Sequence, residues 1–371
     1  MGVWMTAHAV DDFYQGLIPA AIPFFVLDRG YSYTAASGLA LAATLGSSLP
    51  QPLFGIIADR RRMPWMSPLG VTVAGVGAGA AGLAQQYWLV WAMLLLSGLG
   101  VAAFHPAAGK GARRDAAGST SAMSLFAAGG SVGFFLAPAL VTPALVELGL
   151  GATAIFVPPA VLIGFVLWRH ELRARTRATT VTDAAGRDRW VPFALLTALE
   201  VARSVTFFGV NTFIGVYWIR GLGASQGLGG IALAAFLVGG VGGTLLGGRL
   251  GDRLGAVRAV QAGSMLVIPA LILLRVVPEP RVALACAVLA GISVNLPFGV
   301  LVKLGQDYLP SRPGTAAGVT LGLAVSVGGL FTPVLGELAD RHGPGAVFTA
   351  LCAVPVAAVV LSLMLPQPDG A

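Results

Sequence analysis

The sequence has few charged residues. Only 11 % of its 371 residues are Asp, Glu, Lys or Arg, whereas soluble domains carry about 25 %. So few charges cannot solvate a globule of this size, which excludes an ordinary soluble domain. Cysteine is also scarce: Cys286 and Cys352 are the two in the chain, and both lie in apolar stretches, so neither a disulfide framework nor a cysteine metal site is expected.

Other absences narrow the function. The sequence contains no phosphate-binding loop for ATP, which disfavours a self-contained ATP-driven pump. It contains no nucleophile–base arrangement and no sizeable hydrophilic domain, so we expect no enzyme and no cofactor. Arginine outnumbers lysine 21 to 2, and together with the richness in Ala and Gly this suggests a GC-rich bacterial genome.

Apolar residues make up 56 % of the chain and recur in runs of membrane-spanning length. We therefore predict an all-α integral membrane protein with twelve spans. The predicted spans are 8–27, 33–57, 65–84, 87–107, 119–142, 150–168, 190–218, 225–249, 256–277, 282–303, 314–337 and 343–365.

The Lys and Arg residues lie mainly in the predicted loops on one side of the membrane. If the N-terminus is cytoplasmic, seventeen Lys and Arg residues fall on the cytoplasmic side and five on the other, with Arg203 inside a span. This bias predicts that both termini are cytoplasmic. The net charge of +7 is then an orientation signal, and no nucleic-acid partner is expected. We expect a multi-pass monomer in a bacterial cytoplasmic membrane.

A short motif occurs twice, 193 positions apart. Gly55-Ile-Ile-Ala-Asp59-Arg60 closes the second span, and Gly248-Arg-Leu-Gly-Asp252-Arg253 closes the eighth. This spacing predicts a duplicated chain. We predict an N-terminal six-helix bundle (1–168), a cytoplasmic linker (169–189) and a C-terminal six-helix bundle (190–371). Duplicated helical membrane proteins are most often transporters.

Small residues and polar residues mark different spans. Small residues recur every fourth position in spans 2, 5, 8 and 11, as in Gly239, Gly243 and Gly247, and we expect these spans to form the seam between the halves. Polar residues recur in spans 1, 4, 7 and 10, which we expect to line a central cavity, because charge inside a bilayer is costly.

The first span carries the leading candidate for proton coupling. Asp12 shares a helix face with His8 and Gln15. Desolvation makes a carboxyl group hold a proton at higher pH than in water, as a proton carrier requires. Asp11 points about 100° away and is an alternative carrier. The competing interpretation is two solvated carboxylates near the water boundary.

The seventh span carries a second pair. Glu200 and Arg203 are three residues apart, and Asn211 continues the stripe. In one interpretation Arg203 binds an anionic substrate group, since guanidinium suits phosphonate or carboxylate, and Glu200 is released to take up a proton. In the other, the two residues form a permanent ion pair.

His105 precedes Pro106 at the predicted end of span 4. It is a proton relay or a substrate ligand, because unperturbed histidine has a pKa of about 6.5, or else it caps the helix. His8, Asp12 and His105 could in principle bind a metal, but nothing else in the sequence supports this and we expect none. The full candidate sets are Asp12, Asp11 and Glu200 for proton coupling and Arg203, His105, Asn211, His8, Tyr14, Gln15 and Asn295 for substrate binding.

The repeated motif indicates a gate. Each carboxylate could dock on a neighbouring helix N-terminus in one conformation and release it in another. Ordinary topogenic charge would explain the arginines but not the repeat. The predicted gating residues are Gly55, Asp59, Arg60, Gly248, Asp252 and Arg253.

This arrangement resembles the major facilitator superfamily over essentially the whole chain. That family's signature after span 2 is Gly-x-x-x-Asp-Arg-x-Gly-Arg-Arg. The first copy departs from it at Arg61 and Met63, although Arg62 is present, and the second copy matches as far as Gly255.

More specifically, the chain is similar to the fosmidomycin-resistance family of drug exporters. This likeness is carried by His8-x-x-x-Asp12-x-Tyr14-Gln15, Gln51-Pro52-Leu53-Phe54-Gly55, Phe104-His105-Pro106, Ser124-Leu125-Phe126, Gly129-Gly130, Tyr308-Leu309-Pro310, Pro313-Gly314 and Leu338-Ala339-Asp340-Arg341. Gly129, Gly133 and Pro138 also partly match the helix-5 signature of drug–proton antiporters, although Ala137 replaces the glycine before the proline.

The resemblance implies two pseudo-symmetric six-helix bundles and proton-coupled drug efflux, and it leaves the substrate open. We expect a secondary active transporter that exports a small, anionic or amphipathic compound in exchange for protons by alternating access. The alternative is a proton-coupled uptake symporter of an organic acid or a sugar.

Overall fold

In the computed structural model, every regular element is a helix within the residues that the structure describes, which are 1–31, 33–61, 63–177 and 186–368. A bilayer offers no water to unpaired backbone groups, so a chain this apolar satisfies them within helices. The elements before residue 178 are α1 (Gly2–Arg29), α2 (Tyr33–Ser48), α3 (Gln51–Arg60), α4 (Met66–Ala81), α5 (Tyr87–Ala116), α6 (Thr120–Leu148), η1 (Leu150–Phe156) and α7 (Val157–Arg177). Those after residue 185 are α8 (Trp190–Val216), η2 (Tyr217–Gly221), α9 (Gln226–Leu254), α10 (Ala256–Val276), α11 (Pro280–Asn295), α12 (Phe298–Tyr308), α13 (Pro313–Ala317), η3 (Gly318–Leu323), α14 (Ala324–Leu330), α15 (Thr332–His342), α16 (Pro344–Leu351) and α17 (Val354–Leu363).

The membrane spans agree with the prediction in number. Among the described residues, eleven helical stretches are long and apolar enough to cross a membrane, and α4 is a twelfth, shorter apolar helix of 16 residues. Several spans are interrupted rather than straight: α2 and α3 together form the second, and α13, η3, α14 and α15 together form the eleventh. Proline begins or lies near many of these breaks, as at Pro50, because its ring cannot continue the hydrogen-bond ladder.

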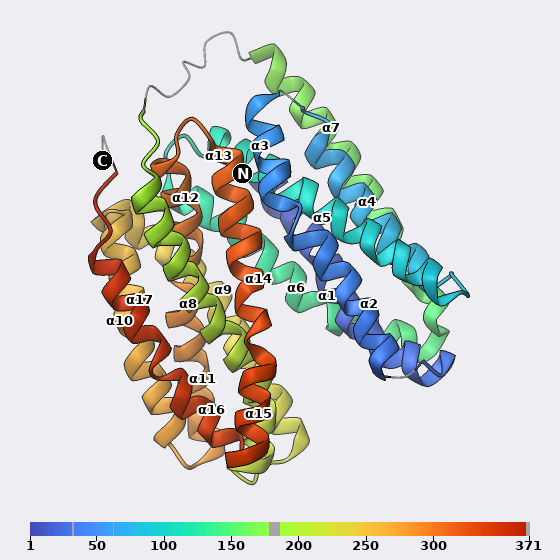
Figure 1. Ribbon diagram of the computed structural model, residues 1–371, viewed down its shortest axis with the longest axis vertical. Coiled ribbons are helices and arrows are strands. Elements are labelled where there is room, and N and C mark those ends of the chain that lie inside the picture. The colour runs from blue at the N-terminus through green and yellow to red at the C-terminus, as the bar shows by residue number, and fades with distance from the viewer. Residues whose placement is uncertain (32, 62, 178–185, 369–371) are drawn as a thin grey trace. The chain divides into compact units, whose positions relative to one another are not determined.

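The chain divides into two compact units. The first unit comprises 1–117, 126–186 and 310–323, and the second comprises 118–125, 187–309 and 324–371. Each unit thus receives a short segment from the other half of the sequence: the first turns of α6 belong to the second unit, and α13 with η3 belongs to the first. Within the first unit, α1, α2, α4, α5 and α7 run alongside one another (Figure 1).

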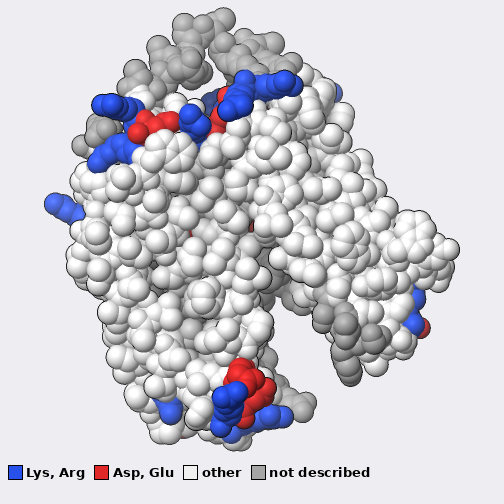
Figure 2. Space-filling view, in the orientation of Figure 1, with Lys and Arg blue, Asp and Glu red and all other residues white. Residues whose placement is uncertain are grey.

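Each unit has its own apolar core. In the first unit, Tyr14, Leu17 and Phe25 from α1 are buried against α2, α4 and α5. In the second, Val210 and Ile214 of α8 are buried with residues of α9, α10, α11 and α16. On the face that Figure 2 shows, most Lys, Arg, Asp and Glu side chains gather toward the upper and lower ends, with largely uncharged surface between them, as expected for helices that cross a membrane.

The glycine stripes let helix backbones pack closely inside each unit, and the expectation that spans 2, 5, 8 and 11 form the seam between the halves stays a prediction. A side chain at Gly239, Gly243 or Gly247 of α9 would collide with backbone of α11 or its end. Likewise, Gly129 of α6 meets the backbone of α1, and Gly46 of α2 meets that of α5. The lack of a Cβ lets these backbones approach closely, which is how helices associate where lipid provides no hydrophobic drive.

The predicted linker 169–189 begins as helix, because α7 continues to Arg177. Residues 178–185 lie outside the described part of the chain, as does Arg62 of the first motif. The division into bundles 1–168 and 190–371 stays a prediction.

Candidate functional site

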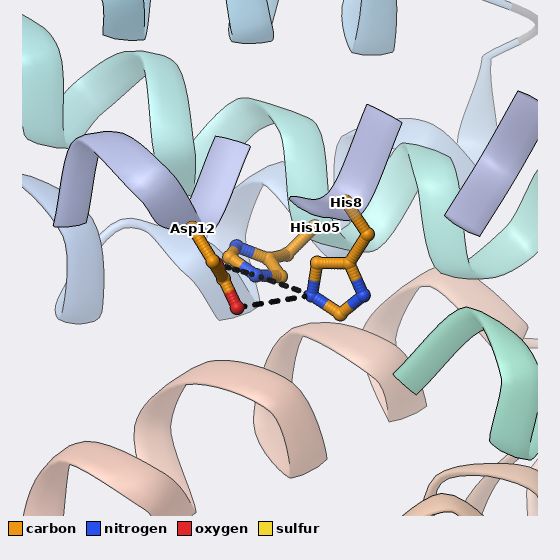
Figure 3. Close-up of side chains that lie close together, drawn as sticks. All are labelled: His8, Asp12 and His105. Carbon is orange, nitrogen blue, oxygen red and sulfur yellow. Dashed lines mark hydrogen bonds and ion pairs between the residues drawn. The ribbon is translucent and has the colours of Figure 1, made fainter. Parts of the chain in front are cut away.

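Three ionisable side chains meet in the first unit. His8 and Asp12 lie one turn apart on α1, and His105 reaches them from α5 (Figure 3). The two Nε2 atoms of His8 and His105 are 3.2 Å apart. The Asp12 carboxylate lies 3.4 Å from His8 Nε2 and 3.1 Å from His105 Nε2. We call these three residues the histidine–aspartate cluster.

The far side of each imidazole is held by a backbone carbonyl. His8 Nδ1 donates to the carbonyl oxygen of Phe126 at 2.8 Å, and the Phe126 ring stacks on the imidazole. The carbonyl oxygen of Val101 lies 3.1 Å from His105 Nδ1. A carbonyl oxygen only accepts, so His8 Nδ1 carries hydrogen, whereas His105 Nδ1 lies between this acceptor and the Gln51 amide donor; both Nε2 atoms are directed toward the cluster.

The two Nε2 atoms lie at hydrogen-bond distance, 3.2 Å apart, so one of them carries a hydrogen and the other accepts it. A neutral His105 meets this condition when its Nδ1 accepts from the Gln51 amide, and a positively charged imidazolium meets it with its charge balanced by the Asp12 carboxylate.

Asp11 lies next to the cluster, and its carboxylate makes no hydrogen bond to the described residues. It is fully buried. Its Oδ2 is 3.7 Å from His105 Nδ1. An ionised carboxylate buried without a partner is costly, so this position also favours a nearby proton or cation.

Asp12 is the most accessible member of the group. Its side chain is 16 % exposed, against 2 % for His8 and 3 % for His105. Gln15, one turn further along α1, donates to Asp12 Oδ1 at 2.6 Å.

Three residues that shape the cluster were named in the family-like motifs of the sequence but were not assigned to the site. Gly130 of α6 leaves room for it, since a Cβ there would lie 2.6 Å from His8 Nε2 and even closer to Asp12. Gln51 places its amide nitrogen 3.2 Å from His105 Nδ1. A buried glutamine within a span was a signal for Gln51, whereas Phe126 acts through its carbonyl, which no side-chain pattern reveals.

A second buried polar group lies in the second unit. The Arg203 guanidinium donates to both Glu200 oxygens, at 2.9 Å from Nε and 2.6 Å from Nη2. Arg203 Nη1 lies 3.5 Å from Asn295 Oδ1, and the guanidinium stands over the Phe298 ring at 4.6 Å. A small pocket beside Arg203 is lined by residues such as Leu199, Thr206, Ser264 and Val294.

Two predicted binding residues lie apart from these groups. Tyr14 is fully buried in the apolar core of the first unit, and its hydroxyl donates to the carbonyl oxygen of Phe156 at 2.6 Å. Asn211 is half-buried on α8, eight residues beyond Arg203.

His105 does not cap its helix, so that expectation is wrong. α5 continues past Pro106 to Ala116, and His105 is buried well inside it. The residues after Pro106 are mostly Ala and Gly with Lys and Arg, which are compatible with helix, and a proline is tolerated within a membrane-spanning helix.

The Asp59 carboxylate holds the start of α13. It accepts hydrogen bonds from the backbone N–H of Gly314 at 2.8 Å and of Thr315 at 2.7 Å, and from the Thr315 hydroxyl at 2.7 Å. A Cβ at Gly55 would lie 2.7 Å from the carbonyl oxygen of Gly314, so this glycine permits the approach. Arg60 is exposed.

The Asp252 carboxylate holds the start of α6 in the same way. It accepts from the backbone N–H of Thr120 at 2.6 Å and of Ser121 at 3.0 Å. Gly248 lies against Ser121 and Ser124, and Arg253 is exposed. The two copies of the motif therefore make equivalent contacts, each carboxylate capping a helix that lies far away in the sequence.

Comparison with known families identifies the fold. The model of the Major Facilitator Superfamily matches residues 4–333. The chain belongs to this superfamily. Superfamily members are membrane transporters, which confirms the expectations of the family, of the helical transporter fold and of a protein that is not an enzyme.

Two curated bacterial relatives match this superfamily member over almost all of its length. The fosmidomycin resistance protein of Escherichia coli K12 is 27 % identical, and the match covers 99 % of this chain and 92 % of the relative. An uncharacterized MFS-type transporter, YfnC of Bacillus subtilis 168, is 28 % identical, with 97 % and 91 % covered.

Solved transporters of the superfamily share the fold. FucP in its outward conformation superimposes with a TM-score of 0.78 at 13 % identity, over 99 % of this chain and 98 % of FucP. The human organic anion transporter MFSD10 (TETRAN) gives a TM-score of 0.73 at 15 % identity, over 97 % and 98 %. At these identities the likeness concerns the fold alone.

Proposed function

We propose that this chain is a secondary active transporter that exports a small anionic or amphipathic compound in exchange for protons. The observation that carries the proposal is the close approach of His8 Nε2 and His105 Nε2, at 3.2 Å beside the Asp12 carboxylate. A transporter coupled to protons needs a buried place where one proton is held and released, and this cluster meets that need.

The Glu200–Arg203 pair is the proposed substrate switch. The Arg203 guanidinium donates to both carboxylate oxygens of Glu200, at 2.9 and 2.6 Å, which is a bidentate ion pair. An anionic substrate group that takes over Arg203 would leave Glu200 without its partner and ready to take up a proton. Substrate binding and proton binding would then be linked in the second unit, with Asn295 as a further contact.

The carboxylate caps are the proposed gate. Asp59 and Asp252 each hold a distant helix N-terminus by two backbone N–H groups. Such contacts either form or break, so they suit a molecule that alternates between two arrangements. We propose that docking and release of these caps accompany alternating access.

The energetics permit export. With about 150 mV across a bacterial membrane, one inward proton supplies about 3.5 kcal/mol. That is enough to sustain an outward substrate gradient of about 300-fold. An anionic substrate leaving the cell would add its own charge movement to this drive.

Transport in everted membrane vesicles tests the proposal. Fosmidomycin, named in one relative, is the first compound to try, followed by a panel of anionic and amphipathic drugs. We expect a transported compound to accumulate inside acidified vesicles and to dissipate the preformed pH gradient. Asp12→Asn should abolish both effects, whereas Asp28→Asn, which alters an exposed carboxylate on the same helix, should leave both intact.

Uptake symport is the second candidate, because a solved neighbour is the E. coli fucose:proton symporter FucP. The same vesicles distinguish the two directions. A symporter would carry its substrate out of acidified everted vesicles, so accumulation would contradict symport, and substrate loss would contradict export.

A further inference from the structure

The nitrogen and oxygen atoms of the histidine–aspartate cluster have the spacing of metal ligands. The Nε2 atoms of His8 and His105 are 3.2 Å apart, Asp12 Oδ1 lies 3.1 Å from His105 Nε2, and Asp12 Oδ2 lies 3.4 Å from His8 Nε2. In a tetrahedral zinc site with bonds of about 2.0–2.1 Å, neighbouring ligand atoms are about 3.3–3.4 Å apart. Within the described residues, the His, Cys, Asp or Glu side chains that converge closely enough to hold a metal are these three. Their ligand atoms all lie within 4.8 Å of one another.

We propose that His8, His105 and Asp12 bind a divalent transition metal ion of the zinc class, with a fourth position left for water or a ligand atom from a bound molecule. The sequence alone did not favour a metal. The packing of α5 on α1, which no local pattern predicts, brings His105 beside His8 and Asp12 as a third ligand.

The surroundings have the features that metal-bound histidines need. A ligating imidazole usually donates its other N–H to a carbonyl or carboxylate, which fixes the ring and the free nitrogen. His8 does this toward Phe126 at 2.8 Å, and the Val101 carbonyl oxygen, 3.1 Å from His105 Nδ1, is placed to accept in the same way when His105 Nε2 binds an ion. Neither ring has to turn before it binds an ion.

Asp11 provides an independent indication. It is a fully buried carboxylate with no hydrogen-bond partner among the described residues, and it lies 3.7 Å from His105 Nδ1. At that distance it accepts no hydrogen bond from the ring, but its negative charge would stabilise a cation held by His105. A divalent ion also offsets the charge of two neighbouring carboxylates, Asp11 and Asp12, more fully than one proton does.

Gly130 keeps one side of the ligand atoms clear. A Cβ there would lie 2.6 Å from His8 Nε2, so any larger residue would fill the space beside the ion. Three protein ligands with an open fourth position are typical of zinc sites that exchange a ligand rather than of purely structural ones.

The test uses the purified full chain in detergent, stripped of metal and titrated with Zn²⁺ by calorimetry. We expect one ion per chain. His8→Ala, His105→Ala and Asp12→Asn should each weaken binding at least 100-fold, and Asp11→Asn should weaken it about 10–100-fold. His170→Ala and His342→Ala remove histidines outside the cluster and should leave the affinity unchanged.

Zinc K-edge X-ray absorption on the unaltered chain answers the question even if a variant fails to fold. We expect two imidazole nitrogens in the first shell at about 2.0–2.1 Å. No saturable binding, a shell without two imidazoles, or loss of binding in the His170 or His342 variants would overturn the proposal. Because the readout is binding, it can fail while proton-driven transport is intact, and it can succeed if transport proves to be symport.

Discussion

At the residue scale, the Glu200–Arg203 pair is the clearest case of mutual dependence. Arg203 and Glu200 are 7 % and 1 % exposed, so neither charge can be solvated if its partner is removed. A buried ion pair contributes little net stability by itself, but breaking it leaves a charge without compensation.

We therefore expect Arg203→Ala to destabilise the protein by about 3–5 kcal/mol. The double variant Glu200→Gln with Arg203→Met should recover most of that loss, because no buried charge is left. Thermal unfolding in detergent measures both. The matched control is Arg341→Ala, which breaks an exposed pair with Glu337 whose side chains are 70 % and 60 % exposed and should cost less than about 1 kcal/mol. Equal losses in the single and double variants would contradict this account.

Gly130 carries a prediction about function. Gly130→Ala places a methyl group against His8 and Asp12, so we expect substrate-driven proton movement to fall at least about 10-fold. Gly242→Ala is the control, since a Cβ at that exposed helical position has open space around it, and helix propensity favours alanine there. Size-exclusion profiles establish that both variants are folded. Full activity of a folded Gly130→Ala variant would contradict the prediction that transport needs the space beside His8 and Asp12.

Only part of the histidine–aspartate cluster could be predicted from the sequence. Helical periodicity placed His8 and Asp12 on one face, because that relation is local. The meeting of His105 with that face depends on how α5 packs on α1, which no local pattern encodes. The contribution of Phe126 is a backbone carbonyl and was invisible in principle.

At the element scale, the repeated motif joins each carboxylate to the first turn of a distant helix. We predict that Asp59→Asn speeds backbone hydrogen–deuterium exchange at Gly314 and Thr315 about 10-fold, corresponding to the loss of about 1–2 kcal/mol of charge-assisted capping. Asp252→Asn should do the same at Thr120 and Ser121.

Each variant serves as the other's control, because the undisturbed cap should exchange at its normal rate. Exchange that rises equally at both caps would mean general loosening of the fold. Exchange that rises at neither would mean that the carboxylates do not hold these helices.

The helices themselves were largely predictable, since a run of about twenty apolar residues in lipid has few alternatives to helix. Their irregularities were not. The break at Pro50 and the π-helical η3 arise where spans adjust to close neighbours. α5 and α12 also extend beyond the apolar spans predicted for them, because polar ends such as Arg113 and Arg114 continue the helix into the charged region. α6 extends to Leu148, six residues beyond its predicted span, through mostly apolar residues.

At the scale of the whole molecule, the charge bias predicts topology. We expect a reporter inserted at 178–185 or fused after Ala371 to lie in the cytoplasm. Single cysteines at Gly30, Gly223 or Glu279, between consecutive helices, should instead react with a membrane-impermeant thiol reagent added to intact cells. A cysteine at Gly255 is the control that should react only after the cells are opened. Labelling of Gly255 from outside would reverse the orientation.

α6 joins the Asp252 cap to the surroundings of His8. Its first turn is held by Asp252, and roughly two to three turns later the same helix presents the Phe126 carbonyl and Gly130 to His8. A hydrogen-bonded helix rises about 1.5 Å per residue and resists compression, so it acts as a stiff rod. If the Asp252 cap lets α6 shift along its axis, the hydrogen bond from His8 to the Phe126 carbonyl must change length with it, and the orientation of that imidazole changes directly.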